Sequence, residues 1–104
     1  ESKIDATIGA YINEHLADDL SVQALCSRFR ISRSEMYAIF KEYFNASVAD
    51  FVKKRRLNRA CALLRETELP VNKIAEQCGI PDYNYFSKTF KKYCGISPRE
   101  FRKK

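Results

Sequence analysis

The chain has 104 residues, of which 45% are hydrophobic and 12% aromatic, which is enough for one domain with a substantial core. It contains only three Gly and three Pro, and no apolar run approaches the length of a membrane span, so a low-complexity or membrane-spanning protein is excluded. Nineteen Lys and Arg against thirteen Asp and Glu give a net charge of +6, which favours a polyanionic partner. Because no signal peptide opens the chain, we expect a soluble, cytoplasmic protein that is mostly helical.

The first part of the chain is predicted to form two helices. Apolar residues recur at intervals of three and four over residues 3–17, which predicts an amphipathic helix that supports the fold. Its outer face is acidic, since residues 1–19 carry five acids against one Lys, a net charge of −4. Ser21 is suited to begin a second, short helix that ends near Phe29.

The next helix has clear signals at both of its ends. Ser32 and Glu35 form an S-x-x-E capping box, which predicts a helix start because the two side chains satisfy each other's free backbone N–H groups. The apolar pattern continues to about Phe44, and Asn45 is suited to the left-handed conformation that ends a helix.

The longest predicted helix begins at Ser47, with Asp50 in the capping-box position, and continues to about Arg65. At 1.5 Å per residue, its roughly 19 residues span about 28 Å, close to one turn of B-DNA. Residues 53–59 carry five positive charges and no acid. We expect this helix to bridge the two halves of the chain.

The last third is predicted to contain three further helices. A short helix after Pro70 ends at Gly79 in a left-handed cap, and Asp82 begins a helix that ends at Cys94, before Gly95. A final short helix begins with a second capping box that has Pro at the first helical position, formed by Ser97, Pro98 and Glu100. Residues 82–104 carry seven positive and two negative charges, a net charge of +5.

The segments 20–51 and 69–101 are two copies of one pattern, a short apolar helix followed by a turn and a basic helix. The identical pairs, first at an offset of 49 and then of 50, are Leu20/Leu69, Val22/Val71, Ile31/Ile80, Phe40/Phe90, Lys41/Lys91, Tyr43/Tyr93, Ser47/Ser97 and Phe51/Phe101. Two copies are too few for a solenoid. Because the positive charge concentrates on the second helix of each pair, the pattern indicates two contacts along a nucleic acid.

Metal, cofactor and catalytic sites are not indicated. The four cysteines, Cys26, Cys61, Cys78 and Cys94, form no CxxC pair, and each lies at an apolar position of its helix. We interpret them as small core residues that stay reduced, with a redox role as the less favoured alternative. The only histidine, His15, has no fixed relation to any Cys or Ser, so we expect neither an enzyme nor a cofactor.

The order and spacing of residues in the second copy resemble the AraC/XylS transcription regulators. The matching residues are Ile74, Ala75, Gly79, Ile80, Tyr85, Phe86, Ser87, Phe90, Lys91, Lys92, Gly95, Ser97, Pro98, Phe101 and Arg102. The resemblance covers nearly the whole chain. It implies an all-α, AraC-type DNA-binding domain over residues 1–104, with about seven helices. Two homeodomain-like helix-turn-helix lobes, 1–46 and 67–104, would be joined by a long central helix over residues 47–66.

The resemblance also implies that the helices from Arg33 and from Tyr83 are recognition helices in successive major-groove segments. With helical spacing, it gives a predicted base-reading set of Arg33, Ser34, Tyr37, Ala38, Tyr83, Asn84, Ser87 and Lys88. Asn84 can bond adenine in two places, Lys88 can donate to guanine, and Ala38 can touch a thymine methyl group. The predicted phosphate-binding residues are Lys41, Lys91, Lys92, Arg99 and Arg102.

Spacing also predicts which side chains of these two helices face the core. They are Met36, Ile39, Phe40 and Phe44 in the first, and Phe86, Thr89, Phe90 and Tyr93 in the second.

The first lobe departs from the family pattern at two positions. Arg30 stands where the second copy has Gly79, so its turn must strain an Arg or take another shape. Ala38 stands where the family often has a long polar side chain.

The expected partner is double-stranded promoter or operator DNA, with a site spanning two major-groove segments roughly 10 base pairs apart. We expect the site to bend, or one lobe mainly to grip phosphate. RNA polymerase is a further possible partner, and localisation would be with the nucleoid. Because residue 1 is Glu, we expect a fragment whose N-terminal sensor or dimerisation domain is missing.

Two alternative functions stay open. One is a helical adaptor that binds other proteins. The other is a single-stranded RNA binder that uses Tyr43, Phe44, Tyr83, Tyr85 and Tyr93.

Overall fold

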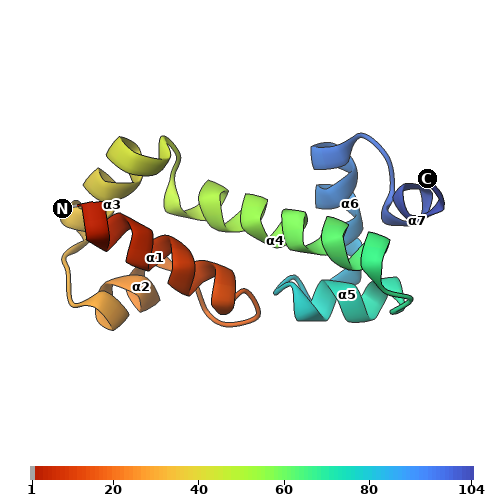
Figure 1. The fold of residues 1–104 in the computed structure, drawn as a ribbon, viewed down its shortest axis with the longest axis horizontal. Coiled ribbons are helices and arrows are strands. Elements are labelled where there is room, and N and C mark those ends of the chain that lie inside the picture. The colour runs from red at the N-terminus through yellow and green to blue at the C-terminus, as the bar shows by residue number, and fades with distance from the viewer. Residues whose placement is uncertain (1) are drawn as a thin grey trace. The chain divides into compact units, whose positions relative to one another are not determined.

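The structure is a computed structural model that describes residues 2–104, with side chains from Ile4 onward. Its described residues form seven α-helices, one π-helical segment and no strand, which confirms the all-α prediction (Figure 1). The elements are α1 (Ser2–Glu14), α2 (Val22–Phe29), α3 (Arg33–Ile39), η1 (Phe40–Phe44), α4 (Val48–Glu66), α5 (Val71–Gln77), α6 (Tyr83–Cys94) and α7 (Pro98–Lys103). They divide into two compact units, and the boundary lies inside α4 between Arg55 and Arg56.

The first unit packs α1 across α2 and α3, and the first turns of α4 complete it (Figure 1). Its core consists of apolar side chains from these helices, from η1 and from the connection between α1 and α2, namely Ile8, Ile12, Leu16, Leu20, Leu25, Met36, Phe40, Val48, Phe51 and Val52. Because α1 supplies Ile8 and Ile12, both fully buried, it acts as the support that its apolar spacing predicts. The helix ends at Glu14 rather than at residue 17, and a turn follows.

The predicted helix through Phe44 changes its winding at Phe40. Residues Phe40–Phe44 continue α3 without a break as the π-helical segment η1, and Asn45 ends it in the left-handed conformation at φ 51°. The Phe44 ring packs on Phe51 of α4, with ring centroids 4.4 Å apart. The predicted inward set of α3 is confirmed, because Met36 and Phe40 are buried while Ile39 and Phe44 pack against the same core.

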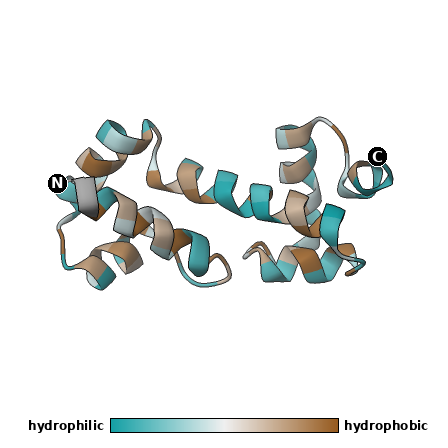
Figure 2. Ribbon diagram, viewed as in Figure 1, coloured by the Kyte–Doolittle hydropathy of each residue, from teal (hydrophilic) through white to brown (hydrophobic). Residues whose placement is uncertain are grey.

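The second unit is built from the later turns of α4 together with α5, α6 and α7 (Figure 1). Its core consists of Leu57, Ala60, Leu63, Leu64, Ile74, Ala75, Cys78, Ile80, Phe86 and Phe90. The last helix, α7, joins this core through Phe101, whose ring meets Phe90 edge-on at 5.5 Å. The middle turns of α4 are hydrophilic (Figure 2) and include the exposed Lys53, Lys54 and Arg55.

The predicted helix starts are confirmed by hydrogen bonds of the capping side chains. The Ala24 N–H donates to the Ser21 hydroxyl at 3.2 Å, and the Asp50 N–H donates to the Ser47 hydroxyl at 3.1 Å. Each such bond satisfies one of the free N–H groups in the first turn of a helix, and a cap of this kind is worth about 1 kcal/mol. The helices are therefore fixed at the residues where the sequence places their first turns.

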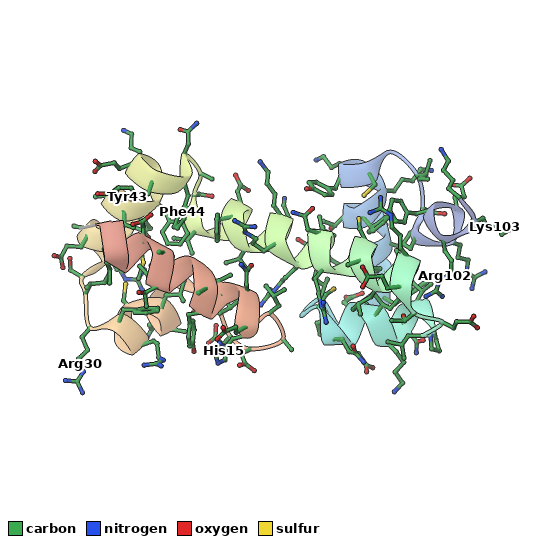
Figure 3. All side chains as sticks on the ribbon, in the orientation of Figure 1. His15, Arg30, Tyr43, Phe44, Arg102 and Lys103 are labelled. Carbon is green, nitrogen blue, oxygen red and sulfur yellow. The ribbon has the colours of Figure 1, made fainter. Side chains whose placement is uncertain are left out.

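The left-handed helix ends are also found at the predicted residues. Gly79 and Gly95 have φ angles of 90° and 86°. Arg30 strains its backbone rather than adopting another turn, since it ends α2 at φ 58° and ψ 45° and donates its N–H to Cys26 O. Its side chain extends away from the first unit (Figure 3).

Candidate nucleic-acid interface

The first candidate surface is the outer face of α3, whose start is fixed by a complete capping box. The Glu35 N–H donates to the Ser32 hydroxyl and the Ser32 N–H donates to the Glu35 carboxylate, both at 3.1 Å. Because the cap fixes the first turn, the residues that follow it leave the helix in defined directions. All four predicted base-reading residues of this helix are exposed, namely Arg33, Ser34, Tyr37 and Ala38.

Tyr37 is the largest exposed group of this face, at 51%. Together with Lys41 and Asn45 it borders a shallow groove that reaches Ser47 and the first turn of α4. This arrangement places a planar aromatic side chain beside a cation and two hydrogen-bonding side chains. A surface of that composition can pack on sugars and bond phosphate oxygens.

The second candidate surface is the outer face of α6. Asp82 caps this helix by accepting the Tyr85 N–H at 3.1 Å. Of the residues that were predicted to read bases, Tyr83, Asn84 and Lys88 are exposed, whereas Ser87 is half-buried. Ser87 therefore has less freedom to reach a base edge than its two neighbours on the face.

The predicted inward set of α6 is only partly correct. Phe86 and Phe90 are fully buried, but Tyr93 is 42% exposed. Its hydroxyl donates to Asn58 Oδ1 of α4 at 2.8 Å. Tyr93 thus carries a polar contact at the rim of the second unit rather than filling its core.

Four of the predicted phosphate-binding residues have free cationic ends. Lys41, Lys91, Lys92 and Arg99 are exposed, and none of them forms a salt bridge within residues 4–104. By contrast, Lys73 on α5 forms a salt bridge with Glu76, at 3.8 Å. Unpaired cations on the rim of a helix face are the groups that a phosphate backbone attracts.

Arg102 differs from the other predicted phosphate-binding residues because its guanidinium group already has partners. It is half-buried, and it donates from Nε to Leu64 O at 3.3 Å and from Nη2 to Thr67 O at 3.1 Å. Both carbonyl groups lie at the C-terminal end of α4, near which Figure 3 shows the Arg102 side chain, while Lys103 points outward. A cation there satisfies free carbonyl groups and complements the helix dipole.

Glu100 is an acidic group beside this cationic surface. The pKa of its carboxyl group is lowered, first because it accepts the Ser97 backbone N–H and the Ser97 hydroxyl group, and further because Lys91 and Lys103 are near. The carboxylate is therefore committed to the capping box of α7, in which the Glu100 N–H donates back to Ser97.

Four of the five aromatic residues named for the RNA-binding alternative are exposed. Tyr43, Tyr83, Tyr85 and Tyr93 are between 38% and 55% exposed, and only Phe44 packs against a core. Tyr83 borders a groove whose other walls are Pro70, Val71, Asn72, Arg99 and Arg102. The exposure of Tyr85 was not predicted, and the available signal was its position in the first turn of a basic helix, three residues after the Asp82 cap.

Metal clusters and membrane-spanning helices were searched for among the described residues. No group of three His, Cys, Asp or Glu side chains between residues 4 and 104 is arranged to hold a metal ion. Within the same range, no helix has both the length and the apolar character to cross a membrane.

Comparisons with known proteins point to one family. A family described as helix-turn-helix domain matches residues 25–104. The HTH-type transcriptional activator RhaR of Mannheimia succiniciproducens is 35% identical over 101 residues, which are 97% of this chain and 36% of that protein. The chain spans about a third of the length of the curated relatives it matches.

Solved structures share the fold. The C-terminal domain of AraT, a response regulator from Geobacillus stearothermophilus, superposes with a TM-score of 0.90 at 32% identity, over 96% of this chain and 84% of that one. The DNA-binding domain of the transcriptional factor AdpA, solved with a target DNA, has the same fold with a TM-score of 0.88 at 24% identity, over 94% and 88% of the two chains. With its two capped helix pairs and this match over most of its length, the chain belongs to the AraC-type helix-turn-helix family of transcription regulator domains.

Proposed function

We propose that this domain binds a specific double-stranded DNA site, with α3 and α6 as recognition helices in successive major-groove segments. The observation that carries the proposal is the matching make-up of the two helix faces. Each begins at a capping side chain, exposes short polar or aromatic residues in its first turns, and has an unpaired Lys at the matched position, Lys41 or Lys91. A B-DNA major groove admits one such helix.

The residues divide by reach and chemistry. Arg33, Ser34, Tyr37 and Ala38 of α3, and Tyr83, Asn84, Ser87 and Lys88 of α6, form the proposed base-reading set, with Ser87 the weakest because it is half-buried. Lys41, Lys91, Lys92 and Arg99 form the proposed phosphate-binding set. We leave Arg102 out of that set, because its bonds to the end of α4 give it a structural role.

The domain organisation follows the same proposal. Two helix-turn-helix lobes, residues 1–46 and 67–104, would share the central helix 47–66 and read a site that spans two major-groove segments roughly 10 base pairs apart. In a longer cytoplasmic regulator, we propose a sensor or dimerisation domain beside this one and RNA polymerase as a partner at the promoter. The length of the curated relatives supports this larger arrangement.

The proposal is tested by selecting bound duplexes from a random DNA pool with this chain, then titrating the enriched site over a salt series with competitor DNA. Specific binding predicts an enriched sequence with two conserved blocks and an affinity that falls steeply as salt rises. An adaptor would enrich no sequence, and an RNA binder would prefer a single strand over the duplex. Either result would reject the proposal.

A further inference from the structure

Two cysteines of the second unit lie close enough to react with each other. The sulfur atoms of Cys61 and Cys94 are 3.7 Å apart, although the residues are 33 positions apart in the chain. Cys61 lies on α4 and Cys94 is the last residue of α6. Both are free thiols, and the two sulfurs need to approach by less than about 2 Å to reach the length of a disulfide bond.

The surroundings of the pair differ from those of the other two cysteines. Cys61 and Cys94 are half-buried and pack against the edge of the second core. Cys78 is fully buried and directs its thiol toward Ala75 O, while Cys26 lies in the first unit, where it is the only cysteine among the described residues. Only the Cys61–Cys94 pair therefore combines a neighbouring thiol with access from solvent.

The contact also assigns different roles to the two sulfurs. Burial, and then the hydrogen bond with Cys61, raises the pKa of the Cys94 thiol to about 11. Either sulfur can be the donor of this contact, but the raised pKa disfavours the Cys94 thiolate. We therefore assign the first attack on an oxidant to Cys61.

We propose that Cys61 and Cys94 are a reversible modification site, at which a peroxide closes a disulfide bond that links α4 to the end of α6. The Cys61 thiolate attacks one peroxide oxygen, which gives a sulfenic acid and, after protonation of the leaving group, one water. The Cys94 sulfur then attacks the Cys61 sulfur, and the hydroxyl group leaves with the thiol proton as a second water. Two thiols thereby lose two electrons to one peroxide, and a dithiol reductant reverses the step.

The Cys61–Cys94 disulfide bond would stabilise the second unit and leave the outer face of α6 in place. Ten positions separate Asn84 from Cys94, about 15 Å along the helix, and the two sulfurs already lie 3.7 Å apart. The bond constrains a long loop of the unfolded chain, which makes unfolding less favourable. We expect the thermal midpoint of the oxidised protein to lie about 5 °C or more above that of the reduced protein.

The test is to treat the folded chain with hydrogen peroxide, block the remaining thiols, and map disulfides after digestion with trypsin. The expected product is a peptide 60–65 joined to a peptide 93–99, formed faster than any link that includes Cys26 or Cys78. Cys61→Ser and Cys94→Ser remove this product, whereas Cys26→Ser, the matched half-buried control, leaves its yield unchanged. A dithiol reductant restores the original mass and thermal midpoint.

Two results would overturn the proposal. One is a folded protein, judged by its helical circular dichroism, that forms intermolecular or scattered disulfides at the same rate as the 60–65/93–99 link. The other is an oxidised protein with that link and an unchanged or lower midpoint. Should Cys61→Ser fail to fold, the wild-type protein oxidised in urea supplies the comparison. In urea, the 60–65/93–99 disulfide should form no faster than the other disulfides, because only the folded chain holds the two sulfurs together.

Discussion

Arg30 and Gly79 occupy the same place in the two helix pairs, and both adopt positive φ angles, 58° and 90°. The turn after the first helix of each pair therefore has the same left-handed bend, with an Arg in one copy and a Gly in the other. An L-residue with a side chain is disfavoured in this region, whereas glycine is not. The first unit tolerates the strain because the Arg30 N–H still closes α2 by donating to Cys26 O.

We predict that Arg30→Gly raises the free energy of unfolding by about 0.5–1 kcal/mol, because it removes the strain and the exposed side chain has no partner to lose. Urea denaturation measures the change. The matched control is Gly95→Ala, where a Cβ atom would meet nothing within 4 Å at φ 86°, so a loss of about 1 kcal/mol would report backbone strain alone. Equal stability of Arg30→Gly and the wild type would contradict the strain at Arg30.

The capped helices could be predicted from the sequence because their determinants are local. Ser32 and Asp82 begin the two proposed recognition helices at an offset of 50, while Ile31 and Ile80 lie at an offset of 49. The extra residue of the second copy is thus Pro81, in the turn. Capping needs only neighbouring residues in the right order, which is why these starts and the left-handed ends were predicted correctly.

The contacts that were missed join residues far apart in the chain. Tyr93 was expected to face the core, yet its hydroxyl bonds Asn58, and the partners of Arg102 lie 35 and 38 positions away. Helical periodicity gives the direction of a side chain, but the packing of α4 against its neighbours decides where a long polar side chain ends. The π-helical winding of η1 leaves no local signal either, because the count of residues from cap to cap is the same in both copies.

Replacement of Lys91 tests the proposed phosphate-binding set. Lys91→Ala is expected to weaken binding to all DNA sequences alike and to lower the slope of log affinity against log salt by about one, because one phosphate loses its cation. The matched control is Lys73→Ala, which removes a Lys that pairs with Glu76 and should change the slope much less. Titration of matched and mismatched duplexes at several salt concentrations measures both. A loss confined to the matched duplex would show that Lys91 reads a base.

Replacement of Asn84 tests base reading by α6. Asn84 is exposed in the first turn after the Asp82 cap, where an amide can bond both N6 and N7 of adenine. We expect Asn84→Ala to relax the preference at one base pair and to cost about 1–3 kcal/mol on the matched site only, with the salt slope unchanged. Competition between the selected site and its single-base variants gives the result. A uniform loss across all variants would instead place Asn84 at the backbone.

Arg102 is predicted to act on stability rather than on DNA binding. Arg102→Lys keeps the charge but cannot donate to Leu64 O and Thr67 O together, so the free energy of unfolding should fall by about 1 kcal/mol. The salt slope of DNA binding should stay the same. Arg99→Lys, an exposed neighbour on the same helix, serves as the control that changes neither quantity. If Arg102→Lys is as stable as the wild type and binds DNA less well, Arg102 contacts DNA.

The buried thiol of Cys78 is predicted to lower the free energy of unfolding as the pH becomes alkaline. Burial raises the pKa of this thiol from an ordinary value of 9.0 to about 11, so the unfolded chain loses the proton first as the pH rises. The resulting stability is complete below pH 9 and is lost between about pH 9 and 11, by about 2.7 kcal/mol at most. Urea denaturation of reduced protein at pH 8 and pH 10.5 measures the decline.

Cys78→Ala separates this thiol from the Tyr, Lys and Cys94 groups that titrate in the same range. The variant loses a buried group and should be less stable at every pH, but its decline between pH 8 and pH 10.5 should be smaller than that of the wild type by about 1–2 kcal/mol. Because the other titrating groups are common to both proteins, the difference between the two declines belongs to Cys78. Parallel declines would mean that the Cys78 thiol titrates alike in the folded and unfolded chains, which its complete burial within the second core argues against.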